Sequence, residues 1–365
     1  MGGIPHAGRK NGRLPVEQGL KGGWTLPFAG HVALPRRHSA CSNPTDSSAP
    51  MKIAILDDYQ NVAAQCADWS PLAVSAELTF FNDHVSDADA LVSRLAPFDI
   101  ICVMRERTPL TAEIVGRLPA LKLIASTGPR NASIDIGAAQ ARGIEIVNTG
   151  YNSYPTIELT WGLILASARH IVTEAQGMRA GMWQKTLGVG LHGKTLGIVG
   201  LGRVGAGVAR VGLAFGMKVV AWSQNLSSDT ASENGVTLAT KEELFRTSDI
   251  VSVHVILSDR TRGLVGRSEF DLMKSSALLV NTSRGPIVVE SALVEALRAK
   301  RIAGAAVDVF DREPLSPEHP FRSFPNVLAT PHIGYVADDL YRTFYQDTVS
   351  NIVSWIARRS ATDPR

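Results

Sequence analysis

The stretch 195-TLGIVGLGRVGAGVARVGLAFGMKVVAWS-223 decides the fold. An apolar run leads into Gly200, Gly202 and Gly205, which have the spacing G-x-G-x-x-G, with Arg203 and Val204 before the last glycine. A helical segment and a second apolar run follow. In this context the glycines permit a tight turn, a close approach of backbone to a pyrophosphate, and packing of helix on strand. The stretch therefore predicts a dinucleotide-binding unit, with the phosphate at the helix N-terminus.

The end of the second apolar run leaves the choice of dinucleotide open. An acidic residue at this place would accept a hydrogen bond from a ribose 2′-hydroxyl and repel a 2′-phosphate. The chain has Ser223 there, followed by Gln224 and Asn225. Ser223 can hydrogen-bond to either group, and no Arg or Lys follows directly to hold a phosphate. Both NAD and NADP therefore stay open as the cofactor.

The rest of the chain alternates short apolar runs with helical segments. Further strands are expected at 52–56, 99–104, 121–126, 144–148, 249–255, 277–281, 304–310 and 327–330. Helices are expected at 87–96, 135–143, 152–171 and 337–359, the third with Ser153 as its cap and Pro155 in its first turn. Such alternation indicates parallel sheets covered by helices.

We therefore expect an α/β protein with two Rossmann-like, doubly wound parallel-sheet domains. The nucleotide-binding domain, residues 151–330, is inserted into a substrate (catalytic) domain made of residues 51–150 and 331–365. The closing helix returns to the first domain.

The first fifty residues differ from the rest. They contain eight Gly and six Pro without a helical or strand period, a composition that resists ordering. We expect residues 1–50 to be a disordered extension, or the result of a start codon assigned too far upstream; a targeting peptide is the alternative. They hold six Lys/Arg and two Asp/Glu, which leaves 31 basic and 32 acidic residues in the remainder. A near-neutral folded part does not indicate nucleic-acid binding.

The bulk composition is typical of a globular chain, with 45% hydrophobic and 19% charged residues. No apolar run reaches the length of about 18 residues that suggests a membrane span. The three cysteines, Cys41, Cys66 and Cys102, are far apart and show no CxxC pairing. This argues against a disulfide framework or a metal site, and it favours a reducing compartment, the cytoplasm.

Several chemically capable residues follow predicted strands of the second series. Arg284 lies in NTSRG (281–285), Asp308 and Glu313 lie in VDVFDREP (307–314), and His332 lies in TPHIG (330–334). Doubly wound sheets bind their ligands at the carboxyl ends of the strands. We therefore expect these side chains to share one ligand site.

Taken together and in this order, the glycine loop, NTSRG, VDVF..EP and TPHIG resemble the D-isomer-specific 2-hydroxyacid dehydrogenase family, over essentially residues 51–359. The resemblance implies a nicotinamide cofactor, a cleft between two domains and a homodimer. It also implies that Arg284 binds the substrate, that Glu313 is the carboxylate partner and that His332 is the acid/base. The cofactor contacts that it implies, besides the glycine loop and Ser223, are Val255, Ile256, Thr261, Thr282, Ser283 and Asp308.

The residue types suit the reduction of a 2-keto acid, in which hydride goes to the carbonyl carbon and a proton to its oxygen. An imidazolium can donate that proton near neutral pH, and a carboxylate on its other nitrogen favours the charged form and orients the ring. A guanidinium matches a carboxylate as a bidentate fork. A structural salt bridge and a packed turn are the alternatives for these three residues.

The expected substrate loop departs from the family pattern. It reads TGPRNASID (127–135), with Gly128 and Pro129 followed by Arg130 where a glycine is usual. MRERT (104–108) adds Arg105 and Arg107 on another loop of the same domain. These arginines are either surface charges or an enlarged anion-recognition site.

The leading interpretation is an active dehydrogenase that works mainly as a keto-acid reductase on a small-molecule substrate. The alternative is a nucleotide-sensing binding protein, similar to the corepressors of the family. The near-neutral folded part and the lack of a recognisable partner-binding tail argue against that alternative. No C-terminal regulatory domain is expected after the last helix. The particular 2-hydroxy acid and the physiological direction of the reaction are not set by the sequence.

Overall fold

The structure, a computed structural model, describes residues 50–362. The predictions for residues 1–49 lie outside this range. The described part contains two sheets, and all of their strand pairs are parallel. The predicted fold class, two doubly wound α/β domains, is confirmed. The predicted domain boundaries stay a prediction.

The first sheet has five strands in the order β2-β1-β3-β4-β5. The strands are β1 (Met51–Ile55), β2 (Ala76–Phe80), β3 (Ile100–Val103), β4 (Leu123–Ser126) and β5 (Glu145–Asn148). The helices between them are α1 (Ala63–Cys66), α2 (Ser70–Ala73), α3 (Ala88–Leu95), α4 (Ala112–Gly116) and α5 (Ile136–Ala141). All residues of β3 and β4 are buried, which explains why their sequences are continuous apolar runs.

The second sheet has seven strands in the order β12-β11-β10-β9-β6-β7-β8. They are β6 (Thr195–Val199), β7 (Lys218–Trp222), β8 (Thr237–Leu238), β9 (Ile250–Val253), β10 (Leu278–Asn281), β11 (Gly304–Val307) and β12 (Val327–Ala329). Its helices are α8 (Arg203–Ala214), α9 (Ser228–Glu233), α10 (Lys241–Thr247), α11 (Arg267–Leu272), η1 (Gly285–Ile287), α12 (Glu290–Arg298) and η2 (Pro320–Arg322). The order reverses between β6 and β9, and the glycine loop follows β6 at this switch point.

The segment between the sheets forms two helices rather than the single one that was predicted. They are α6 (Tyr154–Ala168) and α7 (Ile171–Arg179), and His170 between them has a left-handed backbone with φ of 51°. Ser153 occupies the N-cap position of α6, as predicted, but its side chain makes no capping bond. The Asn152 side chain accepts from the N–H of Tyr154 instead, at 3.1 Å. Pro155 lies in the first turn, as predicted.

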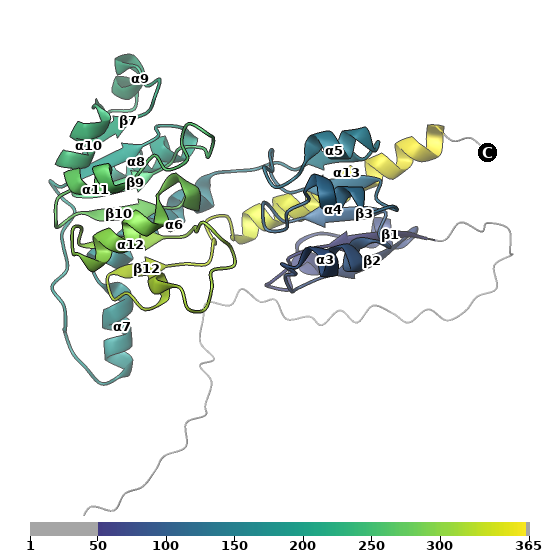
Figure 1. Ribbon diagram of the computed structural model, residues 1–365, viewed down its shortest axis with the longest axis horizontal. Coiled ribbons are helices and arrows are strands. Elements are labelled where there is room, and N and C mark those ends of the chain that lie inside the picture. The colour runs from purple at the N-terminus through teal and green to yellow at the C-terminus, as the bar shows by residue number, and fades with distance from the viewer. Residues whose placement is uncertain (1–49, 363–365) are drawn as a thin grey trace, which may run out of the picture. The chain divides into compact units, whose positions relative to one another are not determined.

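The closing helix α13 (Asp338–Thr362) returns to the five-stranded sheet, as predicted (Figure 1). Its buried face includes Phe344, Ile352 and Trp355, which pack in one core with Ile53 and Leu123 of that sheet. Two strands were not predicted, β2 and the two-residue β8, and both lie at sheet edges. Among residues 50–362, no helix is long and apolar enough to cross a membrane.

Candidate active site

His332 lies in the turn after β12 and is paired with a carboxylate. Its Nδ1 is 2.6 Å from Oε2 of Glu313, and the two side chains are 19% and 33% exposed. The other carboxylate oxygen, Oε1, accepts from the N–H of Phe310 at 2.9 Å. Glu313 is thus held by backbone while it holds the imidazole, so the ring has a fixed orientation and its Nε2 is left for a ligand.

The turn around His332 is organised by Asp308, at the end of β11. Asp308 Oδ1 accepts from the Thr330 hydroxyl at 2.6 Å and from the N–H of Ile333 at 2.9 Å. Oδ2 accepts from the N–H of Gly334 at 2.8 Å. Burial raises the pKa of Asp308, although these bonds and the nearby His332 oppose the rise. The structure therefore shows Asp308 as a fully buried support of the turn, and its predicted contact with the nicotinamide stays a prediction.

Arg284 follows β10 and is fixed by two bonds. Its Nη1 donates to the carbonyl of Ser283 at 2.7 Å, and its Nη2 donates to Oε1 of Glu106 at 2.8 Å. Glu106 belongs to the loop after β3, so this ion pair joins residues that follow strands of the two different sheets. An arginine has more N–H donors than these two bonds use, so Arg284 can still hold an anion.

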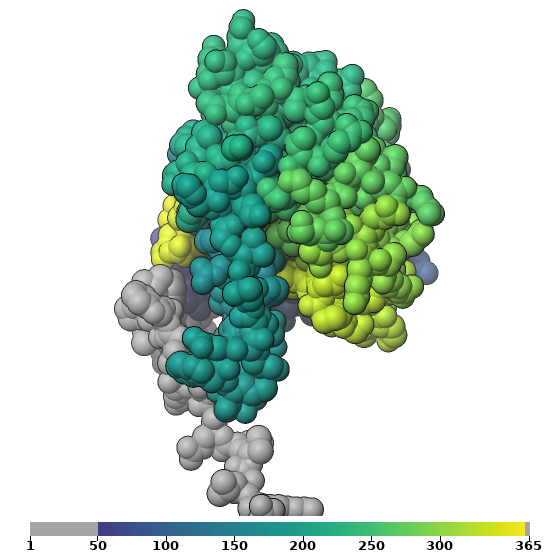
Figure 2. All heavy atoms as spheres, turned by 90° about the vertical axis from the view of Figure 1, so that its left-hand side faces the viewer, coloured from purple at the N-terminus to yellow at the C-terminus, as the bar shows by residue number. Residues whose placement is uncertain are grey.

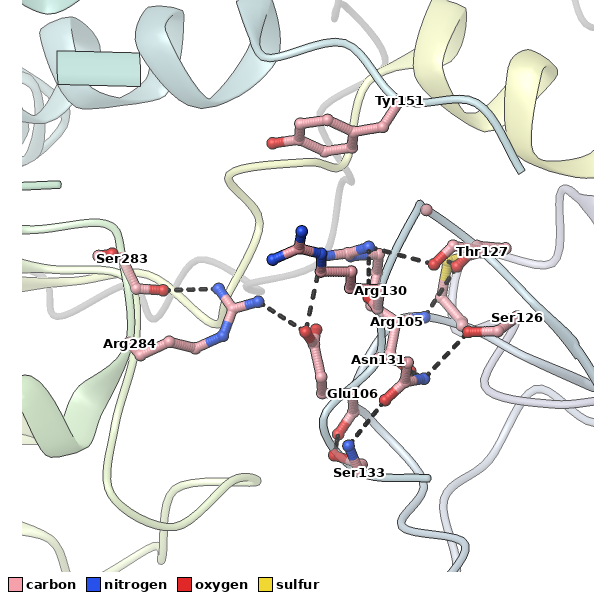
Figure 3. Close-up of polar contacts among 12 residues, drawn as sticks. Arg105, Glu106, Ser126, Thr127, Arg130, Asn131, Ser133, Tyr151, Ser283 and Arg284 are labelled. Atoms are coloured by element: carbon pink, nitrogen blue, oxygen red, sulfur yellow. Dashed lines mark hydrogen bonds and ion pairs between the residues drawn. The ribbon is translucent and has the colours of Figure 1, made fainter. Parts of the chain in front are cut away.

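Glu106 lies between two arginines, as Figure 3 shows. Its Oε1 is 3.6 Å from Nη2 of Arg105 as well as 2.8 Å from Arg284. Burial opposes the ionisation of Glu106, but the Arg284 and Arg105 charges outweigh it and hold the pKa of this carboxyl below its usual value. The Tyr151 ring lies against Arg105, with 5.5 Å from the guanidinium carbon to the ring centroid.

The side chain of Arg105 packs against the backbone of the predicted substrate loop. Its Nη1 donates to the carbonyl of Thr127 at 3.1 Å and lies so close to Gly128 that a Cβ there would meet it. The N–H of Gly128 donates to Thr149 Oγ1 at 2.7 Å, and Pro129 has no N–H. Neither Gly128 nor Pro129 therefore offers a free backbone N–H to a substrate, and the Arg105 guanidinium lies beside Gly128 instead.

Asn131 ties the two arginine-bearing loops together. Its Nδ2 donates to the carbonyl of Arg105 at 2.6 Å and to Ser126 Oγ at 3.2 Å, and its Oδ1 accepts from the N–H of Ser133. The Ser133 hydroxyl donates to the carbonyl of Glu106 at 3.3 Å. The segment RNAS (130–133) thus fixes the backbone of Arg105 and Glu106.

The remaining two predicted arginines differ from Arg105. The guanidinium of Arg107 lies between the Tyr59 and Tyr335 rings, at 4.5 and 5.3 Å from their centroids. It donates to the carbonyl of Asp57 at 2.7 Å and to the Tyr341 hydroxyl at 3.4 Å. The structure therefore does not bring Arg107 to Arg284. Arg130 is exposed, and its side chain forms no ion pair with any residue that the structure describes.

The glycine loop has the geometry that a dinucleotide requires. Gly200 has φ of 101°, and a Cβ on Gly205 would lie 2.0 Å from the Gly200 carbonyl oxygen. Gly202 has no atom near its Cβ position and forms the N-cap of the twelve-residue α8 without a side-chain cap bond. Uncapped N–H groups next to open space suit a pyrophosphate.

Ser223 supports the loop from the next strand. Its Oγ accepts from the N–H of Leu201 at 2.9 Å. A small pocket beside it is lined by Leu201, Gly202, Ser223, Gln224, Asn225, Leu226 and Thr230. None of these side chains is charged, so the pocket neither repels nor specifically pairs a 2′-phosphate.

The other predicted cofactor residues cluster at the ends of β9 and β10. The Ser283 hydroxyl donates to the carbonyl of Val255 at 2.5 Å, and the Thr261 hydroxyl donates to that of Ile256 at 2.6 Å. The Ile256 side chain is 77% exposed, as expected for an apolar contact with a base. Thr282 differs, because it is buried and its hydroxyl lies 2.8 Å from that of Thr160. The residues present thus fit a dinucleotide along this edge. Within residues 50–362, no group of three or more His, Cys, Asp or Glu side chains is arranged to hold a metal.

Sequence reasoning missed three residues of this site, Glu106, Asn131 and Tyr335. The ring of Tyr335 packs edge-on against His332 at 5.5 Å between centroids. Glu106 lies within the quoted MRERT and Asn131 within the quoted loop, so their positions were known. The sequence did not indicate that Glu106 pairs with Arg284 or that Asn131 bonds to Arg105, because these contacts form only when distant loops meet in the fold.

Comparison with known proteins identifies the family that the sequence motifs resemble. The family model described as D-isomer specific 2-hydroxyacid dehydrogenase, NAD binding domain, matches residues 161–334. A glyoxylate reductase of Aeropyrum pernix is 43% identical over 233 residues, which cover 61% of this chain and 70% of that protein. A D-3-phosphoglycerate dehydrogenase of Archaeoglobus fulgidus is 40% identical over 248 residues, 67% of this chain but 47% of that protein. The chain thus spans about half the length of this second relative.

A solved structure agrees over most of the chain. The phosphoglycerate oxidoreductase of Vibrio cholerae is 40% identical, with a TM-score of 0.80 over 84% of this chain and 99% of that chain. The doubly wound sheets and the glycine loop are typical of nicotinamide-dependent oxidoreductases. The chain belongs to the D-isomer specific 2-hydroxyacid dehydrogenase family, which confirms the resemblance and NAD(P) as the cofactor.

Proposed function

We propose that the protein reduces 2-keto acids to D-2-hydroxy acids, with His332 as the acid/base. The observation that carries this proposal is the His332–Glu313 pair at 2.6 Å, on a turn that Asp308 fixes. An imidazolium with a carboxylate on Nδ1 can donate its Nε2 proton and be recharged from solvent. When bound, the nicotinamide supplies the hydride.

In this reaction Arg284 binds the substrate carboxylate and polarises the keto oxygen. Its unused N–H donors suit a bidentate grip, and its bond to Glu106 fixes the guanidinium before the substrate arrives. Such preorganisation aims a charge at the place where negative charge develops on the oxygen. His332 then protonates that oxygen, and Glu313 stabilises the imidazolium from the other side.

A turnover assay tests the proposal. NADH and NADPH are each combined with a panel that includes glyoxylate, pyruvate, hydroxypyruvate and phosphorylated keto acids, and the absorbance of the reduced nicotinamide is followed. Turnover of at least one 2-keto acid, and its loss in Arg284→Ala, are expected. An absence of turnover across the panel, with cofactor binding intact, would support a nucleotide-sensing protein instead.

We also propose that the protein is a homodimer formed through α7 and the residues after it. Large apolar side chains are exposed along this segment, namely Ile171, Val172, Met178, Met182, Trp183, Leu187 and Val189. Figure 2 shows the segment (teal) extending past its neighbours on this face. Exposed apolar side chains concentrated on one segment are typical of an interface. Sedimentation should show a dimer, and Leu187→Glu, at a side chain 94% exposed, should shift it towards monomer.

The cytoplasm remains our proposed compartment. Cys66 and Cys102 are buried free thiols, and burial raises the pKa of both. Unpaired cysteines of this kind are compatible with a reducing environment.

A further inference from the structure

The loop that carries Glu313 is closed at both ends by one carboxylate, that of Glu290. Oε1 of Glu290 lies 3.0 Å from Nε2 of His319, and Oε2 accepts a longer bond from the N–H of Asp311 at 3.5 Å. Asp311 and His319 are the two ends of the segment 311–319, and Glu313 lies between them. Glu290 therefore joins the ends of the segment that holds Glu313.

The direction of the His319 bond follows from the other ring nitrogen. Nδ1 accepts from the N–H of Phe321 at 3.3 Å, so the proton of the neutral ring is on Nε2, which donates to Glu290. The His319 ring also packs edge-on against Phe321, with 4.7 Å between the centroids. Phe321 is buried in the core of the second sheet. The bond to Glu290 is thus anchored at the core.

The sequence of the loop explains why side chains must secure it. EPLSPEHP (313–320) contains three prolines, which carry no N–H and therefore leave few backbone donors. The Arg322 guanidinium fixes the middle of the loop, because Nε donates to the carbonyl of Ser316 at 2.8 Å and Nη2 to that of Leu315 at 2.6 Å. Glu290 fixes its ends.

Glu290 also belongs to the segment that follows Arg284. It is the first residue of α12, and the short helix η1 lies between the two. Gly285, directly after Arg284, packs so closely on the backbone at Phe310 that a Cβ would collide with it. The segments that carry Arg284 and Glu313 are therefore joined twice, by packing at Gly285 and by hydrogen bonds at Glu290.

The position of Glu290 has an electrostatic cost that its bonds offset. Burial raises the pKa of Asp311 and the charge of Glu290 raises it further, while Arg262 and His319 oppose the rise. Two neighbouring carboxylates repel each other, so Glu290 needs donors to be stable at this place. The His319 ring and the N–H of Asp311 are these donors, and the N-terminus of α12 also favours a negative charge.

We propose that Glu290 and His319 are positioning residues that hold Glu313 against His332 and so set the orientation of the acid/base. This inference rests on the proposed function, because the orientation matters only if His332 transfers a proton. Glu290 and His319 act through Glu313. Without their bond the loop is released at one end, the Glu313 carboxylate is no longer fixed relative to Nδ1, and the imidazole loses its orientation.

Kinetics in two backgrounds test the proposal. His319→Ala should lower kcat about tenfold and leave KM close to the wild-type value, because losing a hydrogen bond to a charged group misplaces Glu313 but not Arg284. In the Glu313→Ala background the same change should have no further effect, since a residue that acts through Glu313 has nothing left to position. An equal loss of kcat in the two backgrounds, or a wild-type kcat in His319→Ala, overturns the inference.

Three further variants separate the bond from a general disturbance of the loop. His319→Gln keeps an N–H donor for Glu290 and should recover most of the lost kcat, whereas Glu290→Gln leaves one acceptor for two donors and should lower it. Glu318→Gln is the matched control, because this exposed carboxylate bonds to Ser316 within the loop at 2.6 Å. A loss in Glu318→Gln as large as in His319→Ala overturns the inference. If His319→Ala does not fold, Glu290→Gln replaces it in both backgrounds.

An NMR measurement separates this inference from the proposed function. The His332 imidazole is observed in protein that contains isotope-labelled histidine, and its signals are assigned by their absence from His332→Ala. The Nδ1 signal reports the bond to Glu313, so it should shift in His319→Ala and Glu290→Gln but not in Glu318→Gln. Such a shift supports the positioning role even if no keto acid is turned over. An Nδ1 signal unchanged in both variants overturns it even if keto acids are reduced.

Discussion

The carboxylate of Asp308 fixes the backbone that follows His332. It accepts the N–H groups of Ile333 at 2.9 Å and Gly334 at 2.8 Å, so the imidazole stands on a turn anchored to the end of β11. His332 itself has φ of 52°, a backbone conformation that costs free energy for a residue with a side chain. The anchoring bonds compensate for this cost and give the acid/base a fixed position.

Asp308→Asn should therefore impair catalysis without impairing cofactor binding. The new amide group faces backbone N–H donors and cannot accept from both, so the turn loosens and kcat should fall about tenfold or more. Thr330→Val is the milder control, because it removes only the 2.6 Å hydroxyl bond. Steady-state kinetics and NADH titration measure both quantities. A raised dissociation constant for NADH with kcat preserved would instead favour a direct nicotinamide contact.

The second prediction concerns His332 itself. It is the proposed proton donor, so His332→Ala should lower kcat by about 10² or more while NADH still binds. Glu313→Gln keeps the shape but removes the charge opposite Nδ1, so its loss should be smaller. The pH profile of kcat is the measurement. A near-normal kcat for His332→Ala across that profile would remove His332 from the mechanism.

A pH effect on stability should come from a different histidine, His254, after β9. Its Nε2 is 2.8 Å from Ser252 Oγ, and burial lowers its pKa to about 3. Between this value and 6.5 the unfolded chain binds a proton that the folded chain does not, so stability falls as the pH falls below 6.5.

The magnitude of this effect follows from the slope of the free energy of unfolding against pH. Because the folded pKa lies below this interval, a histidine that stays neutral costs about 2 kcal/mol of stability between pH 6.5 and pH 5. Denaturant unfolding of wild type and His254→Gln at both pH values checks it. The variant keeps a polar partner for Ser252 and should lose less stability on acidification. Equal losses in the two proteins would show that other groups dominate.

The fold was predictable because its strands are buried parallel strands with continuous apolar sequences. The edge strand β2 was not predicted, because its sequence AELTF places Glu77 and Thr79 among apolar residues. A strand at the edge of a sheet needs only partial burial, so its sequence is less apolar than that of a central strand. The break between α6 and α7 was not predicted, because nothing in the sequence around His170 indicates a residue with a left-handed backbone there.

In the candidate site, single motifs located the glycine loop and the His332 turn, and the roles of their residues stay predictions. The charge balance of the site could not be read from the sequence. Glu106 is separated from Arg284 by 178 residues, and a carboxylate in an anion-binding site gives no signal of its own. Only the meeting of the loops after β3 and β10 turns MRERT from a basic segment into an Arg–Glu–Arg arrangement.

Within residues 50–362, the side chain of Arg130 forms no ion pair, unlike Arg105 and Arg284. Because it is exposed, its attraction for a second anionic group on the substrate is that of a surface pair, at most about 1 kcal/mol or fivefold. Arg130→Ala should raise KM about twofold to fivefold for dicarboxylic or phosphorylated keto acids and leave that for glyoxylate unchanged. Arg246→Ala, at an exposed arginine of α10 outside the site, is a charge-matched control. An equal effect on all substrates would mean that Arg130 does not face the substrate.

The last prediction concerns the choice between NAD and NADP. The side chains that line the pocket beside Ser223 are uncharged, and the hydroxyl oxygen of Ser223 already accepts a hydrogen bond from the N–H of Leu201 at 2.9 Å. We therefore expect the wild type to use both cofactors with weak discrimination. In Ser223→Asp one carboxylate oxygen can keep the Leu201 bond while the other accepts from a ribose 2′-hydroxyl and repels a 2′-phosphate. The ratio of kcat/KM for NADH over NADPH should then rise about tenfold or more.

Ser223→Asn, which keeps an acceptor without the charge, should change this ratio little. If the wild type already rejects NADPH by more than about 10³, or roughly 4 kcal/mol, a group outside this pocket performs the exclusion and Ser223 does not govern the choice.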